Sequence, residues 1–237
     1  MEQEKTINVY AGNERTAAFS ALMKNVFLWM TLGLAMTGLT AAYVAGHFSW
    51  IQYLTEHSGL MFGLFIAELG IVWYLSARIM RMSFATAGVM FAVYSILNGI
   101  VLSFIFLAYT METISTTFFV TAGTFGGMAL LGYTVKRDLS TAGRILYMAL
   151  IGLVIATVVN IFVASSALSW ALTYLGVAIF IGLTAYDTQK IKHMLMAYGD
   201  EVNDNTMKLA LLGSLTLYLD FINLFLYLLR IFGGNRD

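Results

Sequence analysis

Three acidic residues lie in or at the end of long apolar stretches of the chain. Asp220 and Glu68 fall well inside such stretches, and Asp187 falls at the end of another. A charged side chain at the centre of a membrane span costs about 2.5–3.5 kcal/mol, even on the lenient insertion scale. An acid kept at such a position is therefore a candidate for binding a proton or an ion.

Asp220 lies about 16 Å into its apolar stretch, which begins at Leu209, at the rise of an α-helix. Small and polar side chains share its helical face: Gly213, Thr216, Asn223 and Tyr227. Such a face turns toward protein or water rather than lipid. Asp220 is then either a proton-responsive group or ion ligand, with Asn223 on an ion pathway, or a buried acid that Asn223 or Tyr227 hydrogen-bonds to lock the helices.

The other acids also allow two interpretations. Asp187 precedes Lys190 by three residues, so it is either part of a functional site or an interfacial acid paired with that lysine. Glu68 either lines an ion pathway or remains a protonated glutamic acid inside the protein. Arg78 and Arg81 follow the stretch that contains Glu68. They either anchor it at the membrane surface or reach back to a carboxylate as a removable ionic latch.

The composition indicates that these acids lie in a membrane protein. Of the 237 residues, 59% are hydrophobic and only 11% are charged, whereas about a quarter are charged in a soluble domain. The formal net charge is zero, which argues against a nucleic-acid partner. Because the chain has no cysteine and no proline, disulfides, thiolate sites and proline kinks are excluded. We expect a lipid bilayer as the partner and no cofactor.

Seven apolar stretches are long enough to cross the bilayer as helices, which takes about 20 residues each. They do not alternate polar and apolar residues as barrel strands do. The sequence predicts an all-α polytopic domain over 25–232, after a polar tail at 1–24 and before a short tail at 233–237. Gly123 and Gly127 predict a close helix contact. The predicted spans are Asn25–Gly46, Ser58–Ala77, Met82–Met111, Ile114–Val135, Ile145–Ala164, Ala167–Tyr186 and Leu209–Leu229.

The basic residues predict the orientation. With seven spans, every lysine and arginine except Arg230 and Arg236 falls on one side. Since the cytoplasmic side carries the positive excess, the amino terminus is expected inside and the carboxyl terminus outside. The segment Asp187–Lys208 is expected to continue the sixth helix to a polar turn near Gly199–Asn205.

Four segments resemble signature regions of the Bax inhibitor family, the transmembrane Bax inhibitor motif proteins, in its bacterial branch. The run Leu217–Phe225, which contains Asp220, is similar to the carboxyl-terminal signature of that family. Supporting likenesses lie at Tyr186–His193, Lys136–Ser140 and Asn160–Phe162.

The resemblance implies a fold of six helices wrapped around a central seventh, in the cytoplasmic membrane of a bacterium. It implies a pH-sensitive leak for calcium or other cations. It also implies that Asp187 and Asp220 form a hydrogen-bonded pair with perturbed pKa values, and that Arg78 or Arg81 acts as a latch. The oxygens of such a pair are hard ligands suited to calcium. Spacing alone does not give the pairing, because counting residues along straight helices separates the two acids by about 10–15 Å in depth.

Two other functional classes are compatible with a membrane protein that carries such acids: an intramembrane protease and a regulatory protein. An intramembrane aspartyl protease also carries an aspartate after tyrosine, as at Tyr186-Asp187. It needs Gly-x-Gly before the second aspartate, where this chain has Leu217-Tyr218-Leu219, and a motif that contains proline. A zinc protease needs His-Glu-x-x-His, which is absent, so we expect no enzyme. A regulatory protein that binds a membrane-bound quality-control protease remains the alternative, with the polar tail and Asp187–Lys208 as contact surfaces.

Overall fold

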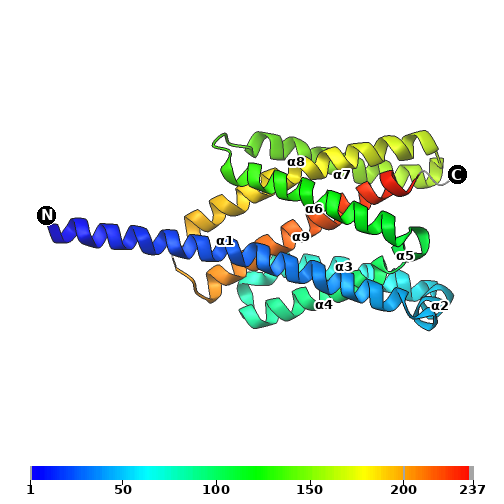
Figure 1. The fold of residues 1–237 in the computed structure, drawn as a ribbon, viewed down its shortest axis with the longest axis horizontal. Helices are drawn as coiled ribbons and strands as arrows, with labels where there is room; N and C mark the ends of the chain where they lie inside the picture. The colour runs from blue at the N-terminus through cyan, green and yellow to red at the C-terminus, as the bar shows by residue number, and fades with distance from the viewer. Residues whose placement is uncertain (1, 200, 235–237) are drawn as a thin grey trace. The chain divides into compact units, whose positions relative to one another are not determined.

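The structure, a computed structural model, describes residues 2–199 and 201–234, with side chains throughout except those of residues 2–13, 48 and 58. The regular elements in this part of the chain are all helices (Figure 1). Residues 235–237 of the expected short tail, including Arg236, lie outside the described residues. The elements are α1 (Glu2–Ala45), α2 (Phe48–Glu56), α3 (Ser58–Arg78), the 3-10 helix η1 (Ile79–Arg81), α4 (Phe84–Leu102), α5 (Ile105–Ala108), α6 (Met111–Thr134), α7 (Ser140–Val163), α8 (Ser166–Tyr198) and α9 (Asp204–Gly233).

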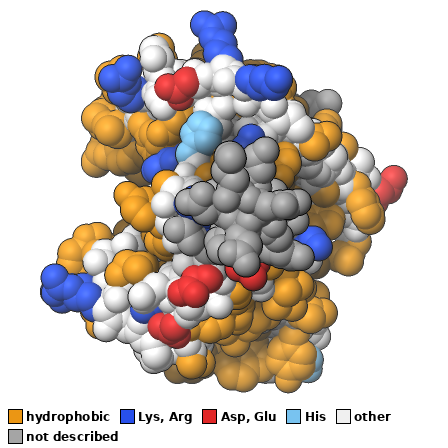
Figure 2. Space-filling model, turned by 90° about the vertical axis from the view of Figure 1, so that its left-hand side faces the viewer, with side chains coloured by type: hydrophobic (Ala, Val, Ile, Leu, Met, Phe, Trp, Pro, Cys, Tyr) orange, Lys and Arg blue, Asp and Glu red, His pale blue; other side chains and the backbone are white. Residues whose placement is uncertain are grey.

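Seven helical segments in the described part are long and apolar enough to cross a membrane, which confirms the predicted all-α polytopic fold. Each contains or overlaps one predicted span, and α4 and α5 together form the third. Many large apolar side chains are exposed on these helices, and Figure 2 shows broad areas of hydrophobic surface. Because water would not solvate such a surface favourably, the bilayer is its natural environment.

The predicted spans differ from the helices in two places. The third span is interrupted at Ser103, whose hydroxyl donates to the Ile100 carbonyl at 2.7 Å, and α5 follows as a separate turn of helix. The segment between the first two spans, expected only as a loop, contains the short helix α2. Neither feature has the length or periodicity of a span, which is why the hydropathy pattern missed both.

The expected continuation of the sixth helix is confirmed. Helix α8 runs on to Tyr198, and α9 begins at Asp204 after a polar turn, within which residue 200 lies outside the described part. The Asn203 carboxamide oxygen caps α9 by accepting from the Thr206 N–H at 3.0 Å. Asp187 is therefore eleven residues before the end of its helix.

The chain divides into two compact units. The first comprises Met1–Ala108 and Ile191–Tyr218, and the second comprises Tyr109–Lys190 and Leu219–Asp237. Helices α8 and α9 thus contribute residues to both units. Many α9 side chains are buried in each, among them Leu215 and Leu224. That six helices wrap around α9 stays a prediction.

Glycines bring α8 close to its neighbours in the second unit. A Cβ added at Gly132 of α6 would collide with the Ala185 backbone, and one added at Gly143 of α7 would collide with the Tyr186 ring. By contrast, Cβ atoms at Gly123 and Gly127 would meet nothing within 4 Å. The predicted close contact at that pair is therefore wrong within this chain, and the tight approach lies nearer the cytoplasmic end predicted for α6.

Candidate functional site

Asp187 of α8 and Asp220 of α9 face each other inside the second unit. Their side chains are only 1% and 5% exposed, and the two carboxyl groups interact electrostatically with each other. The helix register agrees with this placement. Phe180, seven residues before Asp187, stacks on Tyr227, seven residues after Asp220, with ring centroids 5.8 Å apart. Seven residues make about two helical turns. When two residues of antiparallel helices face each other, the residue seven positions earlier on one helix therefore faces the residue seven positions later on the other.

Tyr147 of α7 is the hydroxyl partner of Asp187. Its O–H lies 3.1 Å from both Oδ1 and Oδ2 of Asp187 and donates to that carboxylate. Lys190, one turn beyond Asp187, places its Nζ 5.9 Å from the centre of the Tyr147 ring and 6.0 Å from that of Tyr186. A hydroxyl donor and a nearby cation both stabilise a carboxylate. Tyr147 and Lys190 therefore offset part of the cost of burying a charge on Asp187.

Asp220 has different surroundings. Its Oδ2 is buried and has no hydrogen-bond partner. The Asn223 carboxamide donates to the Leu219 carbonyl at 2.8 Å, and Tyr227 stacks on Phe180. The two residues that were expected to hold Asp220 in a structural role are thus engaged elsewhere. Two carboxyl groups hydrogen-bond to each other only when one carries a proton, because carboxylates lack a donor.

Gln189 fixes the backbone beside this pair. Its Nε2 donates to the Arg137 carbonyl at 2.9 Å, and its Oε1 accepts from the Leu139 N–H at 2.8 Å. These bonds fasten the connection between α6 and α7 to α8, two residues after Asp187. Since α7 begins at Ser140 and carries Tyr147, the same bonds help to position the hydroxyl donor.

Glu68 of α3 lies in the first unit and is buried, so its side chain faces protein rather than lipid. Its Oε1 has no hydrogen-bond partner. Electrostatic interactions relate Glu68 to Tyr94 and Tyr218. The hydroxyl of Tyr218 is bonded to that of Thr37 at 2.7 Å, and Asn98 donates to that of Tyr94 at 3.2 Å. Glu68 is therefore the acid of a separate polar cluster.

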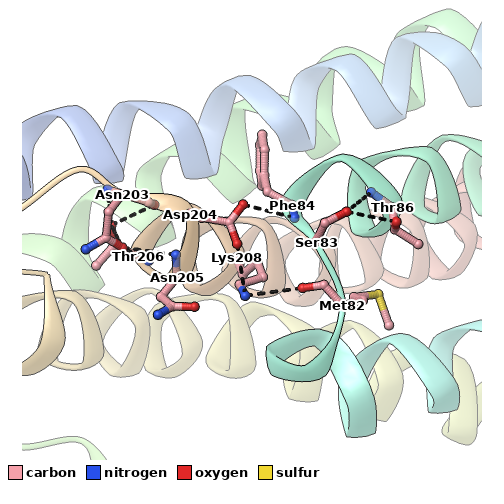
Figure 3. Close-up of polar contacts among 9 residues, drawn as sticks. All are labelled: Met82, Ser83, Phe84, Thr86, Asn203, Asp204, Asn205, Thr206 and Lys208. Carbon is pink, nitrogen blue, oxygen red and sulfur yellow. Dashed lines mark hydrogen bonds and ion pairs between the residues drawn. The ribbon is translucent and has the colours of Figure 1, made fainter.

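Arg78 and Arg81 are exposed at the end of α3 and in η1. No ion pair joins either to a described carboxylate, so the latch stays a prediction. The backbone between η1 and α4 is bound by Lys208 rather than by either arginine. Figure 3 shows Lys208 of α9 donating to the Met82 carbonyl at 3.2 Å and pairing with Asp204 at 3.1 Å.

Asp204 also accepts from the backbone N–H of Phe84 at 3.2 Å, at the start of α4. We call Met82, Phe84, Asp204 and Lys208 the α9 clasp. The clasp joins the start of α9 to the connection between η1 and α4 within the first unit.

No group of three or more His, Asp or Glu side chains in the described part of the chain could hold a metal ion. Calcium takes six to eight oxygen ligands. Asp187 and Asp220 supply at most four carboxyl oxygens, so water or a passing ion's own hydration shell would have to complete the coordination. Calcium binding at the pair stays a prediction.

The sequence is similar to known bacterial membrane proteins. The family model described as "Inhibitor of apoptosis-promoting Bax1" matches residues 20–237. The chain is 50% identical to the inner membrane protein YbhL of Escherichia coli over 93% of its length and 94% of that protein. It is 44% identical to an uncharacterized protein of Rickettsia prowazekii, over 91% and 90% of the two chains. An uncharacterized membrane protein of Streptococcus pyogenes is 40% identical, over 78% and 79%. The match over most of the chain, together with the seven apolar helices, shows that this protein is an integral membrane protein that belongs to the Bax inhibitor family.

Proposed function

We propose that the protein is a pH-sensitive leak for calcium or other cations in a bacterial cytoplasmic membrane, rather than an enzyme, and that Asp187 and Asp220 control it. The observation that carries this proposal is the burial of both carboxyl groups against each other on two helices, with one Asp220 oxygen left unpartnered. Such a pair is rare in membranes, because each intramembrane acid is costly.

The number of protons on the pair sets how α8 and α9 are joined. With one proton, Asp220 donates to Asp187, which also accepts from Tyr147. Without that proton, two negative charges face each other in a medium of low dielectric and repel. The pair therefore titrates as a unit, and a change in proton occupancy shifts an equilibrium between a closed and an open state.

The remaining candidate residues have supporting roles in this proposal. Within the second unit, Asn223 lies on the route of the cation, and Asp187 and Asp220 contact the cation when ionised, as hard oxygen ligands. Glu68 influences the size of the flux from the first unit. Arg78 or Arg81 acts as a cationic latch that engages a carboxylate in one of the two states. The amino terminus lies in the cytoplasm, on the side that carries most of the lysines and arginines.

The test is ion flux into liposomes of purified protein that hold a calcium dye, measured across pH. Asp220→Asn keeps an N–H donor toward Asp187 but cannot lose a proton, so it mimics the singly protonated pair. We expect its flux to be independent of pH and equal to the wild-type flux in the singly protonated state. Glu112→Gln changes an exposed acid in the first turn of α6 and is the matched control. An Asp220→Asn profile that follows the wild type refutes the mechanism.

A second candidate function is docking of a membrane-bound quality-control protease. Helix α1 has 44 residues, a length of about 66 Å at helical rise, whereas the hydrocarbon layer is about 30 Å thick. Its polar first half is therefore long enough to project from the membrane and serve as a contact surface. Co-purification with a membrane protease that Asp220→Asn leaves unchanged, in a protein without pH-dependent flux, would favour this function over the leak.

A further inference from the structure

Helix α2 has no role in the proposed leak. It lies between the first two spans and has nine residues, about 14 Å at helical rise, which is less than half of the hydrocarbon thickness. It cannot cross the membrane. Its side chains divide into three sectors around the helix, and each sector has a different environment.

The first sector packs on the protein. Ile51 and Leu54 are buried in a cluster with Val44 of α1. Partly buried side chains of α3, α4 and the turn that follows complete this cluster: Met61, Leu64, Ile100 and Phe104. Because this face is fixed against the first unit, the rotation of α2 about its own axis is determined.

The second sector is aromatic and exposed. Trp50 and Tyr53 are 52% and 50% exposed, and they lie about 60° apart on one side of the helix. The ring of Tyr53 is held by His57, with ring centroids 4.3 Å apart, and the His57 Nδ1 bonds to the Tyr53 carbonyl at 2.8 Å. About half of each aromatic side chain is thus exposed, and the Tyr53 ring is held in place by His57.

The third sector is polar. Gln52 and Glu56 are one turn apart, and the Gln52 amide donates to the Glu56 carboxylate at 2.8 Å. Thr55 is exposed beside them. The helix carries no lysine or arginine. This sector is therefore suited to water, and nothing in it would attract an anionic partner.

The spans that flank α2 in the chain also expose apolar side chains. Leu39 and Tyr43 at the end of α1 are exposed, as are Leu60 and Phe62 at the start of α3. These residues belong to helices that face lipid. Tryptophan and tyrosine are enriched where hydrocarbon meets the headgroups, since one part of each ring system is apolar and another donates a hydrogen bond.

We propose that α2 is an interfacial helix that lies in the headgroup layer of the bilayer, with Trp50 and Tyr53 among the phospholipid headgroups and with Gln52 and Glu56 in water. The occupant of its aromatic face is the lipid interface, because the spans on either side of α2 in the chain expose apolar side chains, and exposed tryptophan and tyrosine favour the headgroup layer. Since α2 has no basic residue, its binding does not depend on anionic lipid. This proposal is independent of the proposed leak.

Single cysteines that carry a nitroxide label test this placement, and the natural chain has no cysteine to remove. The labels go on Trp50→Cys, Tyr53→Cys, Gln52→Cys and Trp73→Cys, which all replace exposed side chains. Collision rates are measured with oxygen, which concentrates in lipid, and with a water-soluble nickel chelate, in phosphatidylcholine vesicles. Trp73 lies about 12 Å along the helix from Arg81 and is the reference for hydrocarbon.

The expected ratio of oxygen to chelate collisions is highest at position 73, intermediate at 50 and 53, and lowest at 52. Adding phosphatidylglycerol should leave this order unchanged. Labels at 50 and 53 that match position 52 would place the aromatic face in water and overturn the proposal. A second copy of the chain could instead cover the aromatic face. In that case neither reagent would reach the labels at 50 and 53 until the protein is diluted in lipid, and this result would also overturn the proposal.

Discussion

The buried acids of the two units have different neighbours. Glu68 in the first unit has phenols nearby and no second acid, whereas Asp187 and Asp220 in the second unit face each other beside a hydroxyl donor and a lysine. Burial favours the neutral form of any carboxyl group. Two buried carboxyl groups that interact also titrate as a unit rather than one by one. We therefore place the proposed pH sensor at the pair, where a second acid and a hydroxyl donor lie together, and not at Glu68.

Changing one acid in each unit has the largest expected effect on flux. Asp187→Asn should remove the pH dependence of flux completely, since the remaining acid has no carboxyl partner. Glu68→Gln should keep the pH dependence and change only the size of the flux. Both are measured in dye-loaded liposomes, and a pH dependence lost in Glu68→Gln but kept in Asp187→Asn would reverse the assignment.

Gln189→Leu tests whether the second unit depends on the bonds that fasten α8 to the connection before α7. We expect a loss of about 2 kcal/mol in unfolding free energy, because partly buried backbone groups lose their partners. Thermal unfolding in detergent, followed by circular dichroism, measures the loss. Gln52→Leu, at an exposed glutamine of α2, should cost much less, and equal losses would remove the special role of Gln189.

Tyr147→Phe removes the hydroxyl that donates to Asp187 and keeps the ring. Because a carboxylate that loses a donor binds a proton more readily, the midpoint of the flux profile should move upward by about one pH unit. Tyr94→Phe makes the same change in the cluster of Glu68 and should leave the midpoint in place. A common shift in both variants would show that the effect is not local to the pair.

Lys208→Met removes the cation of the α9 clasp in the first unit. The lost hydrogen bond to the Met82 carbonyl should lower the unfolding free energy by about 1 kcal/mol. The midpoint of the flux profile should not move, since Lys208 belongs to the unit that lacks the carboxyl pair. A shifted midpoint with unchanged stability would contradict this separation.

The sequence alone predicts the spans well, because twenty apolar residues in a row have few structural alternatives. It predicts Asp220 as an inward-facing acid from the polar side chains on its face. The contact with Asp187 was implied by family resemblance alone, since the apolar stretch ends near Tyr186 whereas α8 continues to Tyr198. The continuation of that helix past Tyr186 was expected from the sequence, but which residue of α9 meets Asp187 depends on the packing of the two helices.

Other parts of the site depend on contacts between helices, which spacing does not encode. Nothing in the α7 sequence distinguishes Tyr147 from other tyrosines at membrane level. The glycine spacing favoured Gly123 and Gly127, whereas the close approaches occur at Gly132 and Gly143, on two different helices. Which glycine meets a neighbour is decided by helix rotation, and rotation follows from the packing of the whole bundle.

Infrared spectroscopy of the purified protein during a pH titration reports the proton on the carboxyl pair itself, because a protonated carboxyl group has its own carbonyl band. If Asp187 and Asp220 share a titrating proton, one such band disappears as pH rises through the range in which flux changes. Asp220→Asn should lack this titrating band, and Glu68→Gln should keep it. A titrating band that persists unchanged in Asp220→Asn would show that the proton lies elsewhere and that the pair does not control the leak.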